Sequence, residues 1–157
     1  MKYPILILML ALISCNQPGS NSQLQARIDS LEIKLANSYK PGFGEFMSGI
    51  QVHHNKLWFA GINQNWELAD FEIHEIGEAI EAIQKYQQER PETKMIGMIQ
   101  PSLDSLNNTI QKKDSAGFRS AFIRLTENCN NCHKAVNFQF NKVTIPVQPP
   151  FSNQDFK

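Results

Sequence analysis

The chain has 157 residues, of which 41% are hydrophobic and 19% charged, so it suits one globular domain and excludes a disordered chain. Lysine and arginine together number 15, as do aspartate and glutamate, and the formal net charge at neutral pH is zero. This balance argues against a nucleic-acid partner, because nucleic-acid-binding proteins carry an excess of basic side chains that neutralises phosphates.

Residues 1–14 have the features of an export signal. Lys2 is followed by an unbroken apolar run at 5–13, which is too short to cross a bilayer as a helix. The run leads into the sequence LISC, which resembles a bacterial lipobox and implies cleavage before Cys15 and diacylation of its thiol. We therefore expect a lipid-anchored protein on the periplasmic side of a bacterial cell envelope, and Asn16 after the cysteine favours the outer membrane. A plain secretory signal with a chance cysteine is the alternative.

Residues 15–40 are expected to form a lipid tether followed by a stalk helix. The first residues after Cys15 are polar, as a flexible tether should be. Four apolar residues then recur at spacings of four, three and four, which is the pattern of a coiled-coil seam: Leu24, Ile28, Leu31 and Leu35. Because two such repeats are marginally stable alone, the segment is interpreted as a spacer helix resting on the domain or as a weak oligomerisation site. The sequence KPGFG at 40–44 ends this helix.

The first two helices of the main domain are expected at 45–60 and at 66–88. One face of the first carries three apolar residues: Phe46, Ile50 and Leu57. Asn65 is a suitable N-cap for the second helix. Apolar residues alternate three and four apart along that helix: Trp66, Ala69, Ile73, Ile76, Ile80 and Ile83. Its opposite face carries five glutamates, Glu72 among them, and is expected to face solvent.

A third helix is expected from Pro91, which suits a first helical position, to Ile110, and Pro101 should kink it. Asp114 should cap a fourth helix, whose apolar stripe continues into the cysteine pair near the C-terminus. Short connections between these helices predict an all-α fold, an antiparallel four-helix bundle over 41–140. The proline-rich tail at 141–157 cannot be helical, and its apolar side chains should hold it extended across the bundle.

Cys129, Cys132 and His133 form the sequence CNNCH, which has the spacing of a c-type haem attachment motif. Thiols three residues apart on a helix point to one side and can each form a thioether with a haem vinyl group, while His133 reaches the iron. A structural disulfide would leave His133 without a role, and a zinc site would need a second ligand pair. A thioredoxin-like pair would need a strand-to-helix setting. The sequence therefore predicts one covalent haem c, with His133 as the proximal iron ligand.

Because this motif closes the last of four helices, the chain resembles the class II c-type cytochromes, the cytochrome c prime group. The resemblance covers about residues 43–140. It implies a haem attached near the end of the fourth helix and a first helix that faces the other side of the iron. The leader, the stalk and the tail lie outside it.

The distal iron ligand is therefore expected on the first helix. At 100° per residue, His54 lies about 40° from the centre of the inward face at Ile50, and Met47 and His53 lie about 60° from it on opposite sides. We interpret His54 as the favoured distal ligand, Met47 as its alternative and His53 as a third candidate. A site with no distal ligand is a further possibility.

The expected function is that of a monohaem electron carrier that exchanges electrons with redox partner proteins. The alternative is a five-coordinate haem protein that binds or senses a gas. A third interpretation is a lipid-anchored helical scaffold with a disulfide and no haem. The sequence has no phosphate-binding loop, zinc-protease motif, nucleophile elbow or general-base constellation, so an enzyme is not expected. A homo-oligomer through the bundle or the stalk is also considered.

Overall fold

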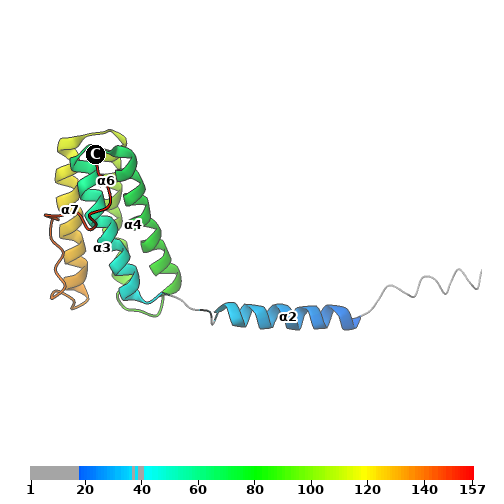
Figure 1. Cartoon of the computed structure of the whole chain (residues 1–157). Coiled ribbons are helices and arrows are strands. Elements are labelled where there is room, and N and C mark those ends of the chain that lie inside the picture. The colour runs from blue at the N-terminus through cyan, green and yellow to red at the C-terminus, as the bar shows by residue number, and fades with distance from the viewer. Residues whose placement is uncertain (1–17, 37, 39–40) are drawn as a thin grey trace, which may run out of the picture. The chain divides into compact units, whose positions relative to one another are not determined.

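The computed structural model describes residues 18–36, 38 and 41–157. The expected export signal and lipidation site, Cys15 included, lie outside the described residues. Every regular element in the described part is a helix, so the expected all-α class is confirmed (Figure 1). The chain divides into two compact units, residues 1–40 and 41–157, and the second is called the helical domain below.

The described part of the first unit is dominated by the helix α2, Pro18–Ala36. Lys34 lies in its last turn, where a positive charge interacts favourably with the helix dipole. The side chains described in this helix, those of residues 21–36, are all exposed, including the apolar stripe that begins at Leu24. No helix in the described residues is both long enough and apolar enough to cross a membrane.

The helical domain begins with two long helices, α3 at Phe43–Ile62 and α4 at Trp66–Tyr86. The first extends two residues beyond each expected end. Asn65 caps the second as predicted, because its side-chain oxygen accepts a hydrogen bond of 3.1 Å from the Leu68 N–H. Two further long helices follow, and these four lie side by side (Figure 1).

The last two long helices are α6, Gln100–Gln111, and α7, Ser115–Ala135. The predicted cap of α7 is confirmed, because the Asp114 side chain accepts a hydrogen bond of 3.0 Å from the Gly117 N–H. The cysteine pair lies in the C-terminal part of α7, as the sequence predicted.

The third helix was predicted as one kinked element from Pro91, and that prediction was wrong. The chain instead forms a single turn α5, Thr93–Ile96, then a 3₁₀ helix η1, Gly97–Ile99, and only then α6. Pro101 lies in the first turn of α6, where its missing N–H leaves no hydrogen bond unmade. Pro101 therefore lies at the start of a helix and does not kink one. The more tightly wound helix η1 connects α5 to α6.

The four long helices bury a common hydrophobic core. Its fully buried members include Leu57, Ile76, Ile83, Leu106, Ile110, Phe118, Phe122 and Leu125. The apolar periodicity of α4 is thus confirmed, but the expectation that its acidic face is solvated was wrong for Glu72, which is 0% exposed. Its carboxylate is paired with two basic residues of α3, which compensates its burial: Oε2 lies 2.6 Å from His53 Nδ1 and Oε1 lies 3.4 Å from Lys56 Nζ.

Gly61 lies where α3 passes the buried ring of Phe118. A Cβ at this position would overlap that ring, so Gly61→Ala is expected to lower the free energy of unfolding by about 2 kcal/mol. Gly77 in α4 is the matched control, because a Cβ there meets no atom within 4 Å. Gly77→Ala should raise stability by up to about 1 kcal/mol through helix propensity. Urea denaturation of both variants checks this, and equal stabilities would contradict the close packing.

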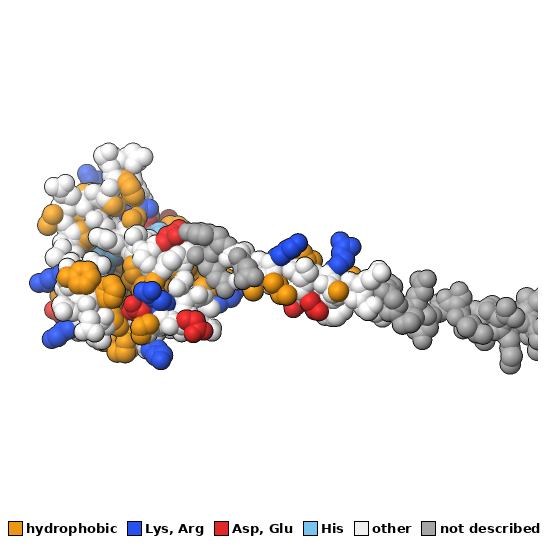
Figure 2. Space-filling model, turned by 90° about the horizontal axis from the view of Figure 1, so that it is seen from below, with side chains coloured by type: hydrophobic (Ala, Val, Ile, Leu, Met, Phe, Trp, Pro, Cys, Tyr) orange, Lys and Arg blue, Asp and Glu red, His pale blue; other side chains and the backbone are white. Residues whose placement is uncertain are grey.

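Aromatic contacts align α3 with α7. The ring centroids of His54 and Phe122 lie 4.4 Å apart, and those of Trp58 and Phe118 lie 6.4 Å apart. Residue numbers thus rise along α3 as they fall along α7, and the C-terminal end of α7 lies beside the N-terminal end of α3 (Figure 1). Figure 2 views the domain from that end, where hydrophobic side chains lie among charged side chains of both signs.

The tail, residues 141–157, contains neither helix nor strand. Ile145 packs against the hydrophobic core, and Phe156 near the end of the tail is buried. The Phe156 ring contacts Phe59 of α3 with centroids 5.8 Å apart. These apolar contacts hold the tail against the helices, and its first residues reach the end of the domain where α7 ends.

Candidate functional site

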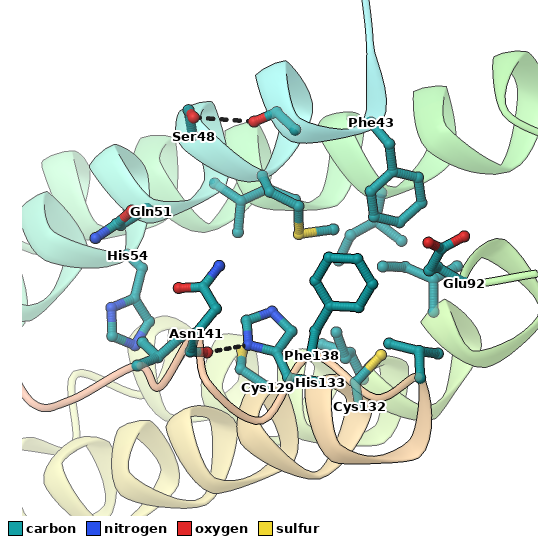
Figure 3. A pocket seen from close by; sticks show the side chains of 18 of the residues that line it. Phe43, Ser48, Gln51, His54, Glu92, Cys129, Cys132, His133, Phe138 and Asn141 are labelled. Atoms are coloured by element: carbon teal, nitrogen blue, oxygen red, sulfur yellow. Dashed lines mark hydrogen bonds between the residues drawn. The ribbon is translucent and has the colours of Figure 1, made fainter. Parts of the chain in front are cut away.

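A cavity of about 230 Å³ lies at the end of the domain where α3 begins and α7 ends. Its walls come from α3, α4, α5, η1, α7 and the start of the tail (Figure 3). Most of the lining is apolar and includes Phe43, Ile50, Ile76, Ile80, Ile96 and Leu125. An apolar cavity with a few polar groups is the usual form of a binding site for a small molecule or a cofactor.

Both cysteines of the CNNCH sequence line this cavity as free thiols. Cys132 is buried and Cys129 is half-buried, and they lie one helical turn apart on α7. Burial, with a smaller contribution from the neighbouring Cys132, raises the pKa of Cys129 to about 12, and burial also raises the pKa of Cys132. Both groups are therefore neutral thiols at neutral pH, unlike the low-pKa thiolate of a thioredoxin-type pair.

His133 is oriented by the backbone of the tail. Its Nδ1 lies 2.6 Å from the carbonyl oxygen of Asn141, drawn as a dashed line in Figure 3. A carbonyl can only accept, so Nδ1 carries a proton, and in the neutral ring Nε2 then has the lone pair. This is the tautomer of metal-binding histidines, which usually donate their other N–H to a carbonyl or a carboxylate. His133 also lines the cavity, so all three motif residues meet there.

Asn130, the first variable residue of the motif, binds the backbone of the tail at Val143, two residues beyond Asn141. Its Nδ2 donates to the Val143 carbonyl at 2.9 Å, and its Oδ1 accepts from the Val143 N–H at 2.8 Å. Together with the bond from His133 to Asn141, this pair holds the tail segment that forms one wall of the cavity. Sequence reasoning missed this contact, because an asparagine side chain beside the motif gives no sign of its distant backbone partner.

Loss of the Asn130 side chain should release this part of the tail. Asn130→Ala is expected to lower stability by about 1–2 kcal/mol and to speed hydrogen exchange at the Val143 amide, because two hydrogen bonds are lost. Asn131→Ala is the matched control, since the Asn131 amide makes only an exposed 3.4 Å contact to Asn128. Exchange followed by NMR checks this. The same exchange rate in both variants would contradict a holding role for Asn130.

His54, the favoured distal ligand from the sequence, is 4% exposed and lines the cavity. Its Nε2 lies 2.9 Å from Thr126 Oγ1, and that hydroxyl donates in turn to the Phe122 carbonyl at 3.0 Å. Thr126 therefore accepts from Nε2–H, and the free lone pair of His54 is on Nδ1. Burial lowers the pKa of His54 to about 4, so the ring is neutral at neutral pH.

The burial of His54 makes stability depend on pH. The unfolded chain takes up the proton near the ordinary pKa of 6.5, while the folded chain resists it down to about 4. The free energy of unfolding should therefore fall by up to about 3 kcal/mol as the pH drops from 7 to 4. His54→Gln should remove this part of the slope, whereas a substitution of the exposed His74 to Gln should keep it. Urea unfolding across this pH range measures both, and parallel curves would contradict the assignment.

His53, the third candidate for the distal ligand, contacts two glutamates of α4. Its Nδ1 lies 2.6 Å from Glu72 Oε2, and its Nε2 lies 3.8 Å from a carboxylate oxygen of Glu75. The described lining of the cavity does not include His53. The structure therefore brings Met47 and His54 to the cavity with the motif, and places His53 in an ionic cluster between α3 and α4.

Met47 lies at a different depth in the cavity from His54. The contact between His54 and Thr126 sets the alignment of α3 with α7. Met47 lies seven residues before His54 on α3, and His133 lies seven residues after Thr126 on α7. Because the two helices run in opposite directions, Met47 and His133 lie at about the same level along the domain. With a rise of about 1.5 Å per residue, His54 lies about 10 Å deeper along the domain than Met47.

The described residues contain no group of three or more histidine, cysteine, aspartate or glutamate side chains arranged to hold a metal ion by themselves. Comparison with known proteins gives no match: no family model fits the chain, and no curated protein or solved structure is significantly similar to it.

Proposed function

We propose that this chain is a monohaem c-type cytochrome that carries electrons and is not itself an enzyme. The observation that carries the proposal is the meeting of Cys129, Cys132 and His133 at one apolar cavity, with His133 Nδ1 already bonded to a backbone carbonyl. Two free thiols one turn apart and an imidazole with an available Nε2 fit the donor set of haem c. In this proposal α3, α4, α6 and α7 form an antiparallel four-helix bundle of the cytochrome c prime kind, with the tail extended across it.

The residues around the cavity would each have a defined part. Cys129 and Cys132 would hold the group through thioethers, and His133 would bind the iron through Nε2. The apolar side chains would keep water away and so reduce the reorganisation that accompanies a change of charge. Bound haem supplies one-electron exchange at its iron.

For the distal side we favour Met47 over His54. Met47 lies at the level of His133, whereas His54 lies about 10 Å deeper. Ligation through His54 Nε2 would also break its hydrogen bond to Thr126 and leave a buried hydroxyl without that donor. A thioether ligand would raise the reduction potential relative to a second imidazole.

The proposed setting is the periplasmic side of the cell envelope, with a lipid on Cys15 as the anchor and the outer membrane as the favoured location. Redox partner proteins would approach the end of the domain that Figure 2 shows. There the rings of Phe138 and Phe140 contact each other with centroids 5.4 Å apart. Phe138 also lines the cavity, and Phe140 is 79% exposed. A partner docked on this pair would lie next to the group in the cavity.

A gas-binding haem protein is the second candidate. The apolar lining near Ile50 on α3 favours it, because a small uncharged gas would enter where no side chain bound the iron. The two candidates differ in one property: the carrier needs a distal ligand and a low-spin iron, whereas the gas-binding protein needs an open position and a high-spin ferrous iron.

The deciding experiment is a haem stain of the full chain on a denaturing gel, together with optical spectra in both oxidation states. We expect one haem that stays with the denatured chain and a low-spin reduced spectrum. A high-spin reduced spectrum would favour the gas-binding candidate. A chain that carries no haem after export, with Cys129 and Cys132 joined by a disulfide, would overturn both candidates in favour of a scaffold.

A further inference from the structure

The exposed stripe of α2 has the residue pattern of a two-stranded coiled coil. In heptad notation Ile28 and Leu35 take position a, and Leu24 and Leu31 take position d. All four side chains are exposed, and Leu31 is 62% exposed. One of the two a positions is β-branched, Ile28, and both d positions are leucine. A β-branched residue at a with leucine at d favours two strands over three or four. The stripe therefore fits a second helix of the same kind.

Charged residues beside the stripe determine the orientation of that second helix. Arg27 takes position g and Glu32 takes position e. In a parallel pair, a g side chain lies beside the partner's e side chain five residues later. Arg27 of each chain would therefore lie beside the partner's Glu32, and the two-fold symmetry gives two such pairs. In an antiparallel pair, g positions face each other, and Arg27 would meet the partner's Lys34 or Arg27 with like charge. The charges are complementary only in the parallel arrangement.

We propose that α2 pairs in parallel and in register with α2 of a second copy of this chain, giving a two-fold symmetric dimer. Leu24, Ile28, Leu31 and Leu35 form the seam, and Arg27 pairs across it with the partner's Glu32. Ile33 takes position f on the outer face and stays exposed in the dimer. The proposal depends on neither the haem nor the lipid anchor, so the tests of the dimer and the tests of the proposed haem function can fail independently of each other.

The seam is only about two heptads long, so the dimer is expected to dissociate on dilution. A lipid anchor would hold both chains on one surface with both α2 helices starting from it, which raises the effective concentration and suits the parallel orientation. The association must therefore be measured across a range of concentrations.

The first test is sedimentation equilibrium of the full chain in a detergent of matched density, with two lysine substitutions in α2. Leu31→Lys should raise the dimer dissociation constant at least about tenfold, because it puts a charge into the seam. Ile33→Lys is the matched control: Ile33 is equally exposed at 62%, and its substitution should change the constant by no more than about twofold. A parent chain that stays monomeric at every concentration, or equal effects of the two substitutions, would overturn the proposal.

The second test exchanges the charges of one pair. Arg27→Glu and Glu32→Arg should each weaken the dimer, because each places like charges across the seam. The double substitution restores opposite charges and should return the dissociation constant to within about threefold of the parent. Failure of the double variant to recover would overturn the parallel register, even with a dimer present.

Discussion

Replacing both Cys129 and Cys132 with alanine is expected to remove all haem from the chain on a denaturing gel. The reason is that each thiol would supply one thioether, and a group held by His133 alone is released when the fold is lost. Each single substitution should keep one thioether and leave a reduced but visible haem stain. Far-UV circular dichroism of the double variant checks that the helices persist, since alanine leaves only a small gap at the cavity wall.

Asn131→Ala is the control for this experiment. Asn131 lies between the two cysteines but is exposed, and it does not line the cavity. Its substitution should leave the stain at the level of the parent chain. A double cysteine variant that retained covalent haem would contradict the proposed attachment. Loss of the stain in the Asn131 variant as well would indicate that the motif acts through local helix structure and not through its thiols.

Met47→Leu is expected to convert a low-spin haem into a high-spin one and to lower its reduction potential. Leucine keeps the apolar volume of methionine, so the variant should lose less than about 1.5 kcal/mol of stability while it lacks the sulfur ligand. His54→Leu is the matched comparison, since it removes an imidazole from the same helix and the same cavity. This second variant should be less stable, because Thr126 loses its partner, but it should keep the low-spin spectrum.

Optical and resonance Raman spectra of both variants separate the remaining cases. A spin change in the His54 variant alone would identify His54 as the distal ligand, which is the residue that the helical angles favour. A parent chain that is already high-spin, with no change in either variant, would mean an open distal position and would support gas binding.

Most of the helical fold could be predicted from the sequence because its determinants are local. The caps Asn65 and Asp114 and the three-and-four spacing of α4 depend on residues within a few positions of one another. The errors arose where distant residues decide. Glu72 is buried where His53 and Lys56 of another helix contact its carboxylate, and a single-helix pattern cannot include such partners.

The candidate site shows the same division. The motif residues all line one cavity, because their spacing on one helix fixes their common side. The choice between Met47 and His54 was harder, because a helical angle gives the face of a residue but not its depth. Depth is set by the alignment of α3 with α7, which the contact between His54 and Thr126 fixes. The bonds from Asn130 and His133 to the tail were not predicted, since backbone partners carry no side-chain pattern.

The segment after α7 that carries Phe138, Asn141 and Val143 forms a wall of the cavity, although it follows the motif in the chain. This order has a consequence for maturation under the proposed function. In a chain exported as proposed, the cysteines would cross the membrane before the segment that encloses them. Haem attached while this side is open would be enclosed afterwards, when Asn130 and His133 form their bonds to the backbone of the tail. The tail would then cover this side of the cavity only after the haem is attached.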